Sequence, residues 1–209
     1  MFLKKDVKKF FKGFWFLLWK DESFKGWLFS IIFIFIFIKF VFFPVLSLLT
    51  GTPLPLAIVE SCSMYHNGNL LSNTDSWFSR HEEKYSAFGI EKNEFSLFSF
   101  ERGMNKGDIL FVLGVKPEKL EVGDIIIFNA EQRNPIIHRI IEIKNEGNER
   151  IFSTIGDNNN GQIDFEQRIK SGQISGKPLV KIAPYLGWIK LVFFENSKSS
   201  SERGFCEEN

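Results

Sequence analysis

The sequence contains few cysteines and few histidines. It has two cysteines, Cys62 and Cys206, and three histidines, His66, His81 and His138. One cysteine adjoins two serines and the other lies in a polar C-terminal stretch, so a disulfide framework is not indicated. No pair of histidines, with or without a cysteine, has a recognised metal-ligand spacing. We therefore expect no metal site and no cofactor.

A strong excess of charge of either sign is also lacking. The 26 Lys and Arg residues are nearly balanced by 25 Asp and Glu residues, which gives a formal net charge of +1. A protein that binds nucleic acid by neutralising phosphates needs a basic surface. The composition therefore argues against a nucleic-acid partner.

Phenylalanine, in contrast, is abundant, with 25 residues concentrated near the N-terminus. Residues 27–49 read WLFSIIFIFIFIKFVFFPVLSLL, and a helix of about 20 apolar residues crosses a bilayer. Lys39 costs roughly 2.5–3.5 kcal/mol at a helix centre, but each surrounding Leu, Ile, Phe or Val returns about 0.3–0.6 kcal/mol. We predict a transmembrane helix over 26–50.

The first 25 residues carry an excess of lysine over acidic residues. The positive-inside rule keeps such a segment in the cytoplasm, so the rest of the chain is expected outside the cell membrane as a single-pass protein. Residues 10–19 are too short for a second span and suit an interfacial segment. A cleavable signal peptide is the alternative, but the apolar run is longer than a signal h-region and no small-x-small cleavage site follows.

Residues 51–195 are expected to form the extracytoplasmic domain. Short runs rich in Ile, Val and Phe, separated by Gly, Asn, Pro and Asp, occur at 106–114, 122–130, 134–143, 150–156 and 173–184. Such runs predict a mainly β, antiparallel and partly barrel-like fold. Residues 185–195 are interpreted as a strand or a membrane-touching edge, and 196–209 as a polar, disordered tail.

Residues 66–105 have a different character and are interpreted as an inserted, α-containing segment. They mix charges with several aromatic residues, and 76–88 could form an amphipathic helix. Either this insert packs on the β domain, or its aromatics dip into the lipid interface as a flap.

The run IVESCSMYHNG, residues 58–68, presents two serines, Ser61 and Ser63, soon after the apolar segment. A serine hydroxyl is a poor nucleophile unless a base removes its proton. His138, in the strand-like run PIIHRIIEI, is the best candidate base, although a histidine on an apolar strand is more often a core residue. The turn STIGDNNNGQID that follows supplies Asp157 and Asp164, either of which could orient an imidazole.

Other interpretations of these residues are weaker. DNNNG lacks the alternating ligands and terminal Glu of an EF-hand, which argues against calcium. Cys62 is interpreted as a small buried side chain, with a cysteine nucleophile as the minor alternative. His66 and His81 remain rival bases within the insert.

The ordered set of Ser-x-Ser-Met after an anchor, Gly-Asp-Ile strands, His-Arg-Ile and Gly-Asp-Asn-Asn resembles type I signal peptidases. It is most similar to the archaeal and endoplasmic-reticulum branch, in which histidine replaces the lysine base of bacterial enzymes. The resemblance covers the anchor and residues 58–64 and 106–190. It implies a membrane-tethered serine endopeptidase that removes signal peptides from preproteins. The implied partners are these signal peptides and the lipid bilayer, with the protein translocation machinery as a further candidate.

The resemblance also implies roles for individual residues. Ser63 matches the nucleophile, His138 the general base and Asp164 the acid that orients it, with Asp157 as a supporting acid. The backbone N–H of Ser63 and the hydroxyl of Ser61 would stabilise the oxyanion.

The sequence departs from the family pattern at several points. Cys62 stands where the family often has Gly, and the insert separates Ser-Met from the first Gly-Asp. The second aspartate follows the first by seven residues instead of about six, which leaves their ranking open.

Two rival functions remain. A self-cleaving repressor-type peptidase would use a Ser/Lys dyad, for which Lys144 and Lys181 are the formal candidates. A catalytically silent, membrane-anchored β domain that binds a protein partner is the second rival.

Overall fold

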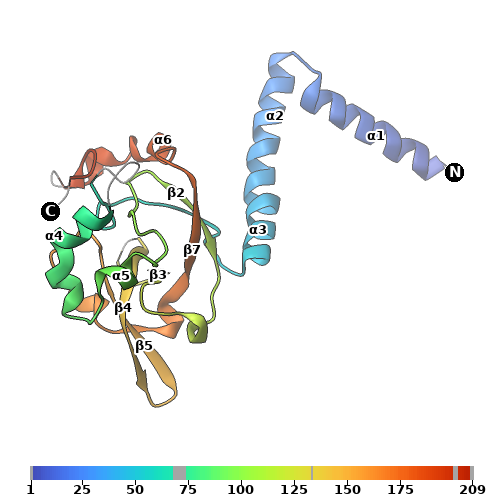
Figure 1. The fold of residues 1–209 in the computed structure, drawn as a ribbon. Coiled ribbons are helices and arrows are strands. Elements are labelled where there is room, and N and C mark those ends of the chain that lie inside the picture. Colours follow the sequence, from blue (N-terminus) through green and yellow to red (C-terminus); the bar gives the residue numbers. More distant parts are fainter. Residues whose placement is uncertain (1, 68–73, 133, 200–201, 208–209) are drawn as a thin grey trace. The chain divides into compact units, whose positions relative to one another are not determined.

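A computed structural model describes residues 2–67, 74–132, 134–199 and 202–207. The chain divides into two compact units, residues 1–49 and residues 50–209 (Figure 1).

The N-terminal unit is helical. Helix α1 covers Phe2–Trp19, and after a short turn α2 covers Phe24–Phe37. A π-helical turn, η1 (Ile38–Phe42), continues into α3 (Phe43–Thr50). Pro44 lies just after the π-helical turn, where its missing N–H and its ring disturb the regular α-helical hydrogen bonds.

Within the described residues, one helix, Phe24–Thr50, is long and apolar enough to cross a membrane. It covers the predicted range 26–50. Most of its large apolar side chains are exposed in this structure, and a helix that is apolar all round needs an apolar environment. Its length and composition are compatible with a membrane anchor.

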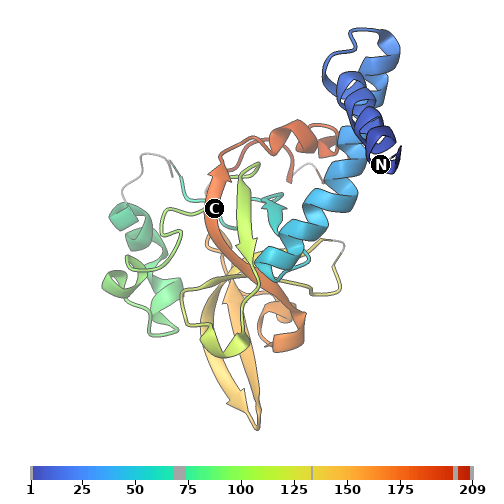
Figure 2. The same ribbon diagram turned by 90° about the vertical axis from the view of Figure 1, so that its right-hand side faces the viewer.

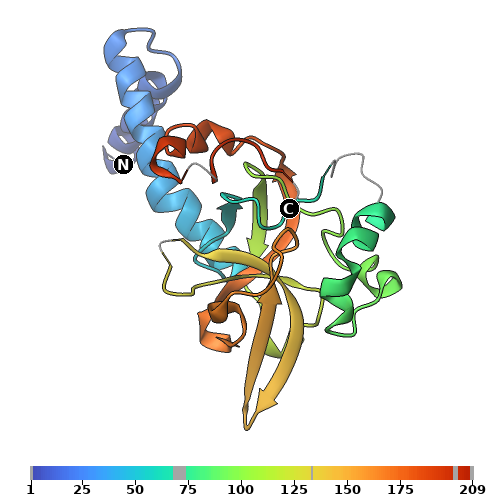
Figure 3. The ribbon, with the colours of Figure 1, turned by 90° about the vertical axis from the view of Figure 1, so that its left-hand side faces the viewer.

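The second unit is built on one antiparallel sheet of seven strands. The strands are β1 (Leu56–Ile58), β2 (Ile109–Leu113), β3 (Ile125–Phe128), β4 (Ile136–Glu146), β5 (Glu149–Ile155), β6 (Ile169–Lys170) and β7 (Ile174–Ala183). Their order is β1-β2-β7-β3-β4-β5-β6. The hairpin of β4 and β5 projects from the unit in all three ribbon views (Figures 1, 2 and 3). The predicted mainly β, antiparallel, partly barrel-like fold is confirmed.

The burial of the strands follows their place in the sheet. β2 alternates between buried and half-buried residues, which is the pattern of a strand with one face on the core. All four residues of β3 are buried, because Ile125 and Ile127 pack in one core cluster while Ile126 and Phe128 pack in another. The continuous apolar run IIIF is therefore a central strand.

The two Gly-Asp-Ile steps, 107–109 and 123–125, form the same tight turn into a strand. The glycine φ is 92° in both, which favours glycine. In each step the aspartate accepts a backbone hydrogen bond from the residue three positions earlier, at 2.8 and 3.1 Å. The two aspartates also form ion pairs with Lys181 and Lys177 of β7. The interpretation of both Gly-Asp-Ile steps as tight turns into strands is confirmed. Lys181 is engaged in an ion pair that stabilises the first of these turns.

The insert contains α4 (Thr74–Ser86) and α5 (Lys92–Phe95). Both helices lie beside one side of the sheet in the two opposite views of Figures 2 and 3. Four aromatic residues of these helices are fully buried and pack with Ile141 and Ile155 of the sheet: Trp77, Phe78, Tyr85 and Phe95. The interpretation that the insert packs on the β domain is confirmed, and these four aromatics are not available to lipid.

The C-terminal part differs from the prediction. Residues 185–195 contain a short helix, α6 (Trp188–Leu191), instead of a strand. The stretch predicted to be a disordered tail is folded over its described residues, with a 3₁₀ turn, η5, at Glu195–Ser197. Three further 3₁₀ turns are η2 (Pro117–Lys119), η3 (Asp164–Glu166) and η4 (Ser171–Gln173).

The two cysteines form a disulfide, Cys62–Cys206, which joins residues 144 positions apart. The expectation that a disulfide framework is not indicated was therefore wrong, and Cys62, interpreted as a small buried side chain, is half-buried and disulfide-bonded. No local pattern links the two cysteines, since their proximity depends on the folded C-terminal segment.

Candidate active site

Ser63 lies on a tight turn that is fixed at both ends. Before the turn, the N–H of Val59 donates to the Asp108 carbonyl at 2.9 Å, and the N–H of Tyr65 closes the turn onto the Cys62 carbonyl at 3.1 Å. After it, Met64 is buried in the core with 1% of its surface exposed. Ser63 itself is half-buried, and its Oγ lies 3.1 Å from the Oγ of Ser61. The turn therefore presents both hydroxyls from a rigid base.

His138 lies on β4, opposite Ile126 of β3, and is only 4% exposed. Its Nδ1 is hydrogen-bonded to Oε1 of Glu166, which is fully buried. The other oxygen of Glu166 accepts a hydrogen bond from the N–H of Ile163 at 2.7 Å. Because the carboxylate is held from both sides, it fixes the imidazole ring and favours the tautomer with hydrogen on Nδ1.

The carboxylate beside His138 is thus Glu166, where the sequence favoured Asp164. Asp164 is exposed and lies two residues earlier in η3. Sequence reasoning missed Glu166 because the family spacing called for an aspartate about six residues after Asp157. The run DFE offers two acids, and only the direction of the 3₁₀ turn decides which one faces the core.

The turn at residues 156–158, which follows β5, contacts both Ser63 and His138. The N–H of Asn158 donates to the Ser63 carbonyl at 2.7 Å, and its side-chain amide donates to the Cys62 carbonyl at 3.1 Å. On the other side, a Cβ added to Gly156 would lie 2.9 Å from Nε2 of His138. The three consecutive residues 156–158 therefore bind the serine turn at one end and lie beside Nε2 of His138 at the other.

Asp157, the other predicted acid, lies in a buried ionic cluster. Its carboxylate accepts hydrogen bonds from Arg139 at 2.7 and 3.0 Å and from the Tyr85 hydroxyl at 2.8 Å, and lies 3.0 Å from Nε2 of His66. Burial alone would raise the pKa of Asp157, but the Arg139 guanidinium and the hydrogen bonds hold it well below its usual range. The aspartate is therefore a fixed negative charge inside the fold.

The insert contributes to the same cluster through Lys84 on α4. Its ammonium donates to the carbonyls of Asp157 and Asn159 at 2.5 and 3.0 Å. Burial lowers the pKa of Lys84 to about 8, although the nearby Asp157 opposes this shift. The insert thus also holds the 156–159 turn.

The rival bases His66 and His81 belong to an aromatic stack. Their rings lie on Trp77 with centroid distances of 3.5 and 4.2 Å. Burial lowers the pKa of His66 even though Asp157 favours its protonated form. His81 Nδ1 lies 2.8 Å from the Trp77 carbonyl. Both rings are therefore engaged in packing the insert.

The lysines of the Ser/Lys alternative are also engaged elsewhere. Lys144 forms an ion pair with Glu142 at 2.8 Å on β4, and Lys181 forms one with Asp108 at 2.6 Å. Within the part of the chain that the structure describes, no group of three or more His, Cys, Asp and Glu side chains could hold a metal ion.

Comparison with curated proteins reveals similarity to signal peptidases. The chain is 32% identical over 108 residues to the signal peptidase complex catalytic subunit SEC11C of Homo sapiens and to that of Mus musculus, over 48% of this chain and 55% of each relative. It is 30% identical over 104 residues to the signal peptidase complex catalytic subunit SEC11 of Scheffersomyces stipitis, over 47% of this chain and 62% of the relative. The resemblance to the endoplasmic-reticulum branch of type I signal peptidases, inferred from the motifs, is thereby confirmed.

The chain spans a little over half the length of the curated relatives that it matches. No family model matches it.

Proposed function

We propose that the protein is a membrane-anchored serine endopeptidase that cleaves signal peptides from secreted or membrane preproteins. Ser63 is the nucleophile and His138 the general base. The observation that carries this proposal is the 156–158 turn, which contacts the Ser63 carbonyl through Asn158 and borders Nε2 of His138 at Gly156. The similarity to signal peptidase catalytic subunits supports it independently.

The chemistry assigned to these residues is acyl transfer. Ser63 Oγ attacks the scissile carbonyl while Nε2 of His138 takes its proton, and the imidazolium then protonates the leaving amine. Water, activated by the same imidazole, hydrolyses the acyl-enzyme. Glu166 serves as the positioning residue, because its carboxylate accepts from Nδ1 of His138. This role replaces the one expected for Asp164.

Charge that develops on the carbonyl oxygen needs preorganised donors. The backbone N–H of Ser63 and the hydroxyl of Ser61 are the proposed donors. The 3.1 Å separation of the two serine hydroxyls supports this assignment, because a carbonyl attacked by Ser63 would lie within reach of Ser61. Asp157 is assigned a supporting role, since it fixes the turn that borders the site.

The anchor places this chemistry at the membrane. The proposed span is Phe24–Thr50, with the basic N-terminus in the cytoplasm and the catalytic unit on the extracytoplasmic side of the cell membrane. The Cys62–Cys206 disulfide supports that side, because disulfides persist in oxidising compartments. Preprotein signal peptides and the lipid bilayer are the proposed partners, and the protein translocation machinery is a further candidate.

The test uses the full chain in detergent with a signal-bearing precursor. Wild type is compared with Ser63→Ala, His138→Ala and, as a matched control, Ser86→Ala, which removes an exposed hydroxyl on α4. We expect wild type and Ser86→Ala to release the mature protein, whereas the other two variants do not. Equal processing by all four proteins would exclude the peptidase assignment. Absence of processing by wild type would favour the alternative, a catalytically silent anchored β domain that binds a protein partner.

A further inference from the structure

The C-terminal segment is attached to the loop that carries Ser63. We call residues 202–207 the C-terminal clasp. Its Cys206 is disulfide-bonded to Cys62, the residue directly before Ser63. The Glu207 carbonyl accepts a hydrogen bond from the side-chain amide of Asn158 at 2.9 Å, and the same amide donates to the Cys62 carbonyl at 3.1 Å. The clasp therefore contacts both the serine loop, at Cys62, and the 156–158 turn, at Asn158.

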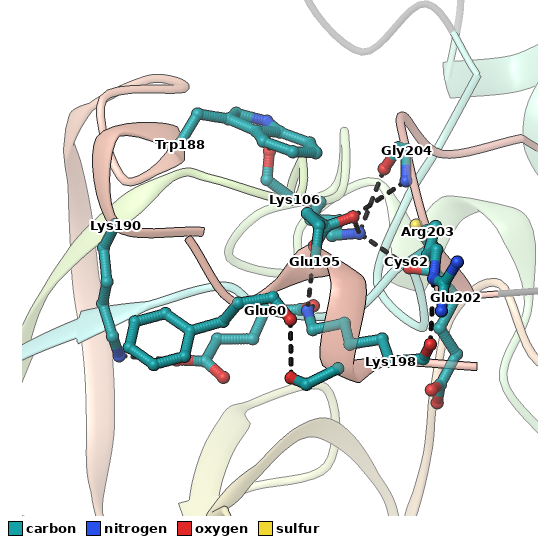
Figure 4. Close-up of polar contacts among 12 residues, drawn as sticks. Glu60, Cys62, Lys106, Trp188, Lys190, Glu195, Lys198, Glu202, Arg203 and Gly204 are labelled. Carbon is teal, nitrogen blue, oxygen red and sulfur yellow. Dashed lines mark hydrogen bonds and ion pairs between the residues drawn. The ribbon is translucent and has the colours of Figure 1, made fainter. Parts of the chain in front are cut away.

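The clasp is held by a group of hydrogen-bond acceptors around the Lys106 ammonium, which Figure 4 shows and which we call the Lys106 socket. The Lys106 side chain is 1% exposed. Its ammonium donates to Glu195 Oε2 at 2.9 Å and to the carbonyls of Glu202 and Gly204 at 2.7 and 3.0 Å. These acceptors use all three N–H donors of the ammonium. A buried lysine without such partners would be strongly destabilising, so the socket requires the clasp.

A second group of contacts joins the C-terminal residues to the start of the serine loop. The Lys198 ammonium donates to the Glu60 carbonyl at 2.6 Å, and Arg203 Nε donates to the Lys198 carbonyl at 3.0 Å (Figure 4). Lys190 of α6 forms an ion pair with the Glu60 side chain at 2.8 Å. Residues 60 and 62, which lead into Ser63, are thus fixed from the C-terminal side.

We propose that the Cys62–Cys206 disulfide makes this segment a redox-controlled clasp, which holds the Ser63 loop in its catalytic position when oxidised and releases it when reduced. A dithiol supplies two electrons and two protons. Cys62 and Cys206 become thiols, and the dithiol becomes a disulfide. The consequence for activity rests on the proposed peptidase function, whereas the release of the loop does not.

The position of the disulfide makes reduction feasible. Both cysteines are half-buried, so a thiolate can reach the bond. After reduction only hydrogen bonds and ion pairs hold the clasp, and several of its residues, including Glu202, Arg203 and Phe205, are exposed. A loop held by one fewer covalent tie visits more conformations, and a shift of about 1 Å in a catalytic group can lower its rate roughly 100-fold.

The activity test measures kcat and KM of the full chain on a signal-bearing precursor before and after treatment with dithiothreitol. Mass spectrometry confirms the gain of two hydrogens. We expect kcat to fall at least about tenfold with little change in KM, and to recover after re-oxidation. Cys206→Ser is the matched variant, which should have the reduced activity already and should not respond to dithiothreitol. Unchanged or increased activity of the wild type on reduction would overturn the proposal.

Hydrogen exchange supplies a readout that needs no substrate. Amides of residues 58–67 and 202–207 should exchange faster in the reduced protein and in Cys206→Ser, while those of β3, β4 and β5 stay protected because the sheet remains folded. If the amides of residues 58–67 exchange at the same rate in the oxidised and reduced proteins, the clasp proposal is overturned, whatever the activity measurements show. If no form cleaves the precursor but exchange changes as expected, the peptidase function fails and the clasp stands.

The Lys106 socket gives an independent variant with the disulfide intact. Lys106→Gln should increase exchange in residues 202–207 and lower kcat, since glutamine lacks the positive charge and one of the three N–H donors that the ammonium uses there. The control is Lys144→Gln, which breaks an exposed pair on β4 and should change neither quantity. Equal behaviour of the two lysine variants would show that the socket does not hold the clasp.

Discussion

The protein contains two buried histidine–carboxylate pairs that have the same chemical groups and different surroundings. In the His138–Glu166 pair, the side-chain hydrogen bonds of Glu166 among the described residues are with the His138 ring and the Ile163 N–H, and none is with a lysine or arginine. Nε2 of His138 borders the 156–158 turn, which binds Ser63. In His66–Asp157 the carboxylate is already paired with Arg139. Among the described residues, the other nitrogen of His66 is buried without a hydrogen-bond partner.

This difference separates a pair suited to proton transfer from one suited to structure. A general base must gain a proton during the reaction, and a nearby uncompensated carboxylate stabilises the imidazolium that forms. Glu166 can do this for His138. Asp157 is neutralised by Arg139, and His66 is stacked on Trp77 away from solvent, so protonation of His66 would place an extra positive charge in the core. Proximity of a histidine to an acid is therefore not sufficient evidence of catalysis.

The largest expected effect comes from replacing each histidine in turn. His138→Gln should lower kcat/KM for a signal-bearing precursor at least about 10⁵-fold, because the general base is lost. His66→Gln keeps an N–H that can donate to Asp157 and should lower kcat/KM by less than about tenfold, since only packing changes. Comparable losses in the two variants would remove the distinction between the pairs.

The second-largest expected effect comes from replacing Glu166, the carboxylate that is hydrogen-bonded to His138. Glu166→Gln should lower kcat by up to about 10⁴-fold, because an amide at this position no longer fixes the tautomer or stabilises the imidazolium. Asp164→Asn is the matched change at an exposed acid in the same 3₁₀ turn and should have little effect. A larger loss in Asp164→Asn would restore the ranking that the sequence suggested.

A third prediction tests the structural pair through stability. Asp157→Asn leaves the buried Arg139 charge uncompensated and should lower the free energy of unfolding by about 3–5 kcal/mol, measured by urea denaturation. The control is Glu146→Gln, which breaks an exposed pair with Arg168 and should hardly change stability. A small effect of Asp157→Asn would mean that the cluster does not hold the fold.

The smallest expected effect is a pH dependence of stability due to His66. Burial lowers its pKa in the folded state, so below about pH 6.5 the unfolded chain binds more protons and the free energy of unfolding decreases as the pH falls. His66→Gln removes this titration. The decrease between pH 7.5 and 5.5, measured by urea denaturation, should therefore be smaller in the variant. An equal decrease in both proteins would show that His66 does not titrate differently on folding.

Much of the fold could be predicted because its signals are local. The runs rich in Ile and Val became β2, β3, β4, β5 and β7, and the Gly-Asp-Ile steps became tight turns. The strands β1 and β6 contain only three and two residues, which is too short for a periodic pattern. Residues 185–195 have the composition of a strand, but contacts such as the bond from the Trp188 indole to the Lys106 carbonyl favour a helical turn.

The candidate site depends on local motifs for some residues and on the folded chain for others. Ser63, Ser61 and His138 stand in short motifs, so the sequence could indicate them. Glu166 and the Cys62–Cys206 disulfide could not be predicted in this way, because each depends on which side chains face inward after the chain has folded. Asp157 was recognised as important, but its partners Arg139 and His66 lie on other segments and give it a different surrounding from the one expected.

The most direct test of the proposed relay is ¹⁵N nuclear magnetic resonance of the histidine rings in wild type and Ser63→Ala. With three histidines in the chain, the signals can be assigned by single substitutions. The neutral His138 should carry its hydrogen on Nδ1, facing Glu166, and the Nε2 resonance of His138 should shift when the Ser63 hydroxyl is removed, while that of His66 stays in place. A His138 ring with its hydrogen on Nε2, or an Nε2 resonance that is identical in the two proteins, would contradict the relay.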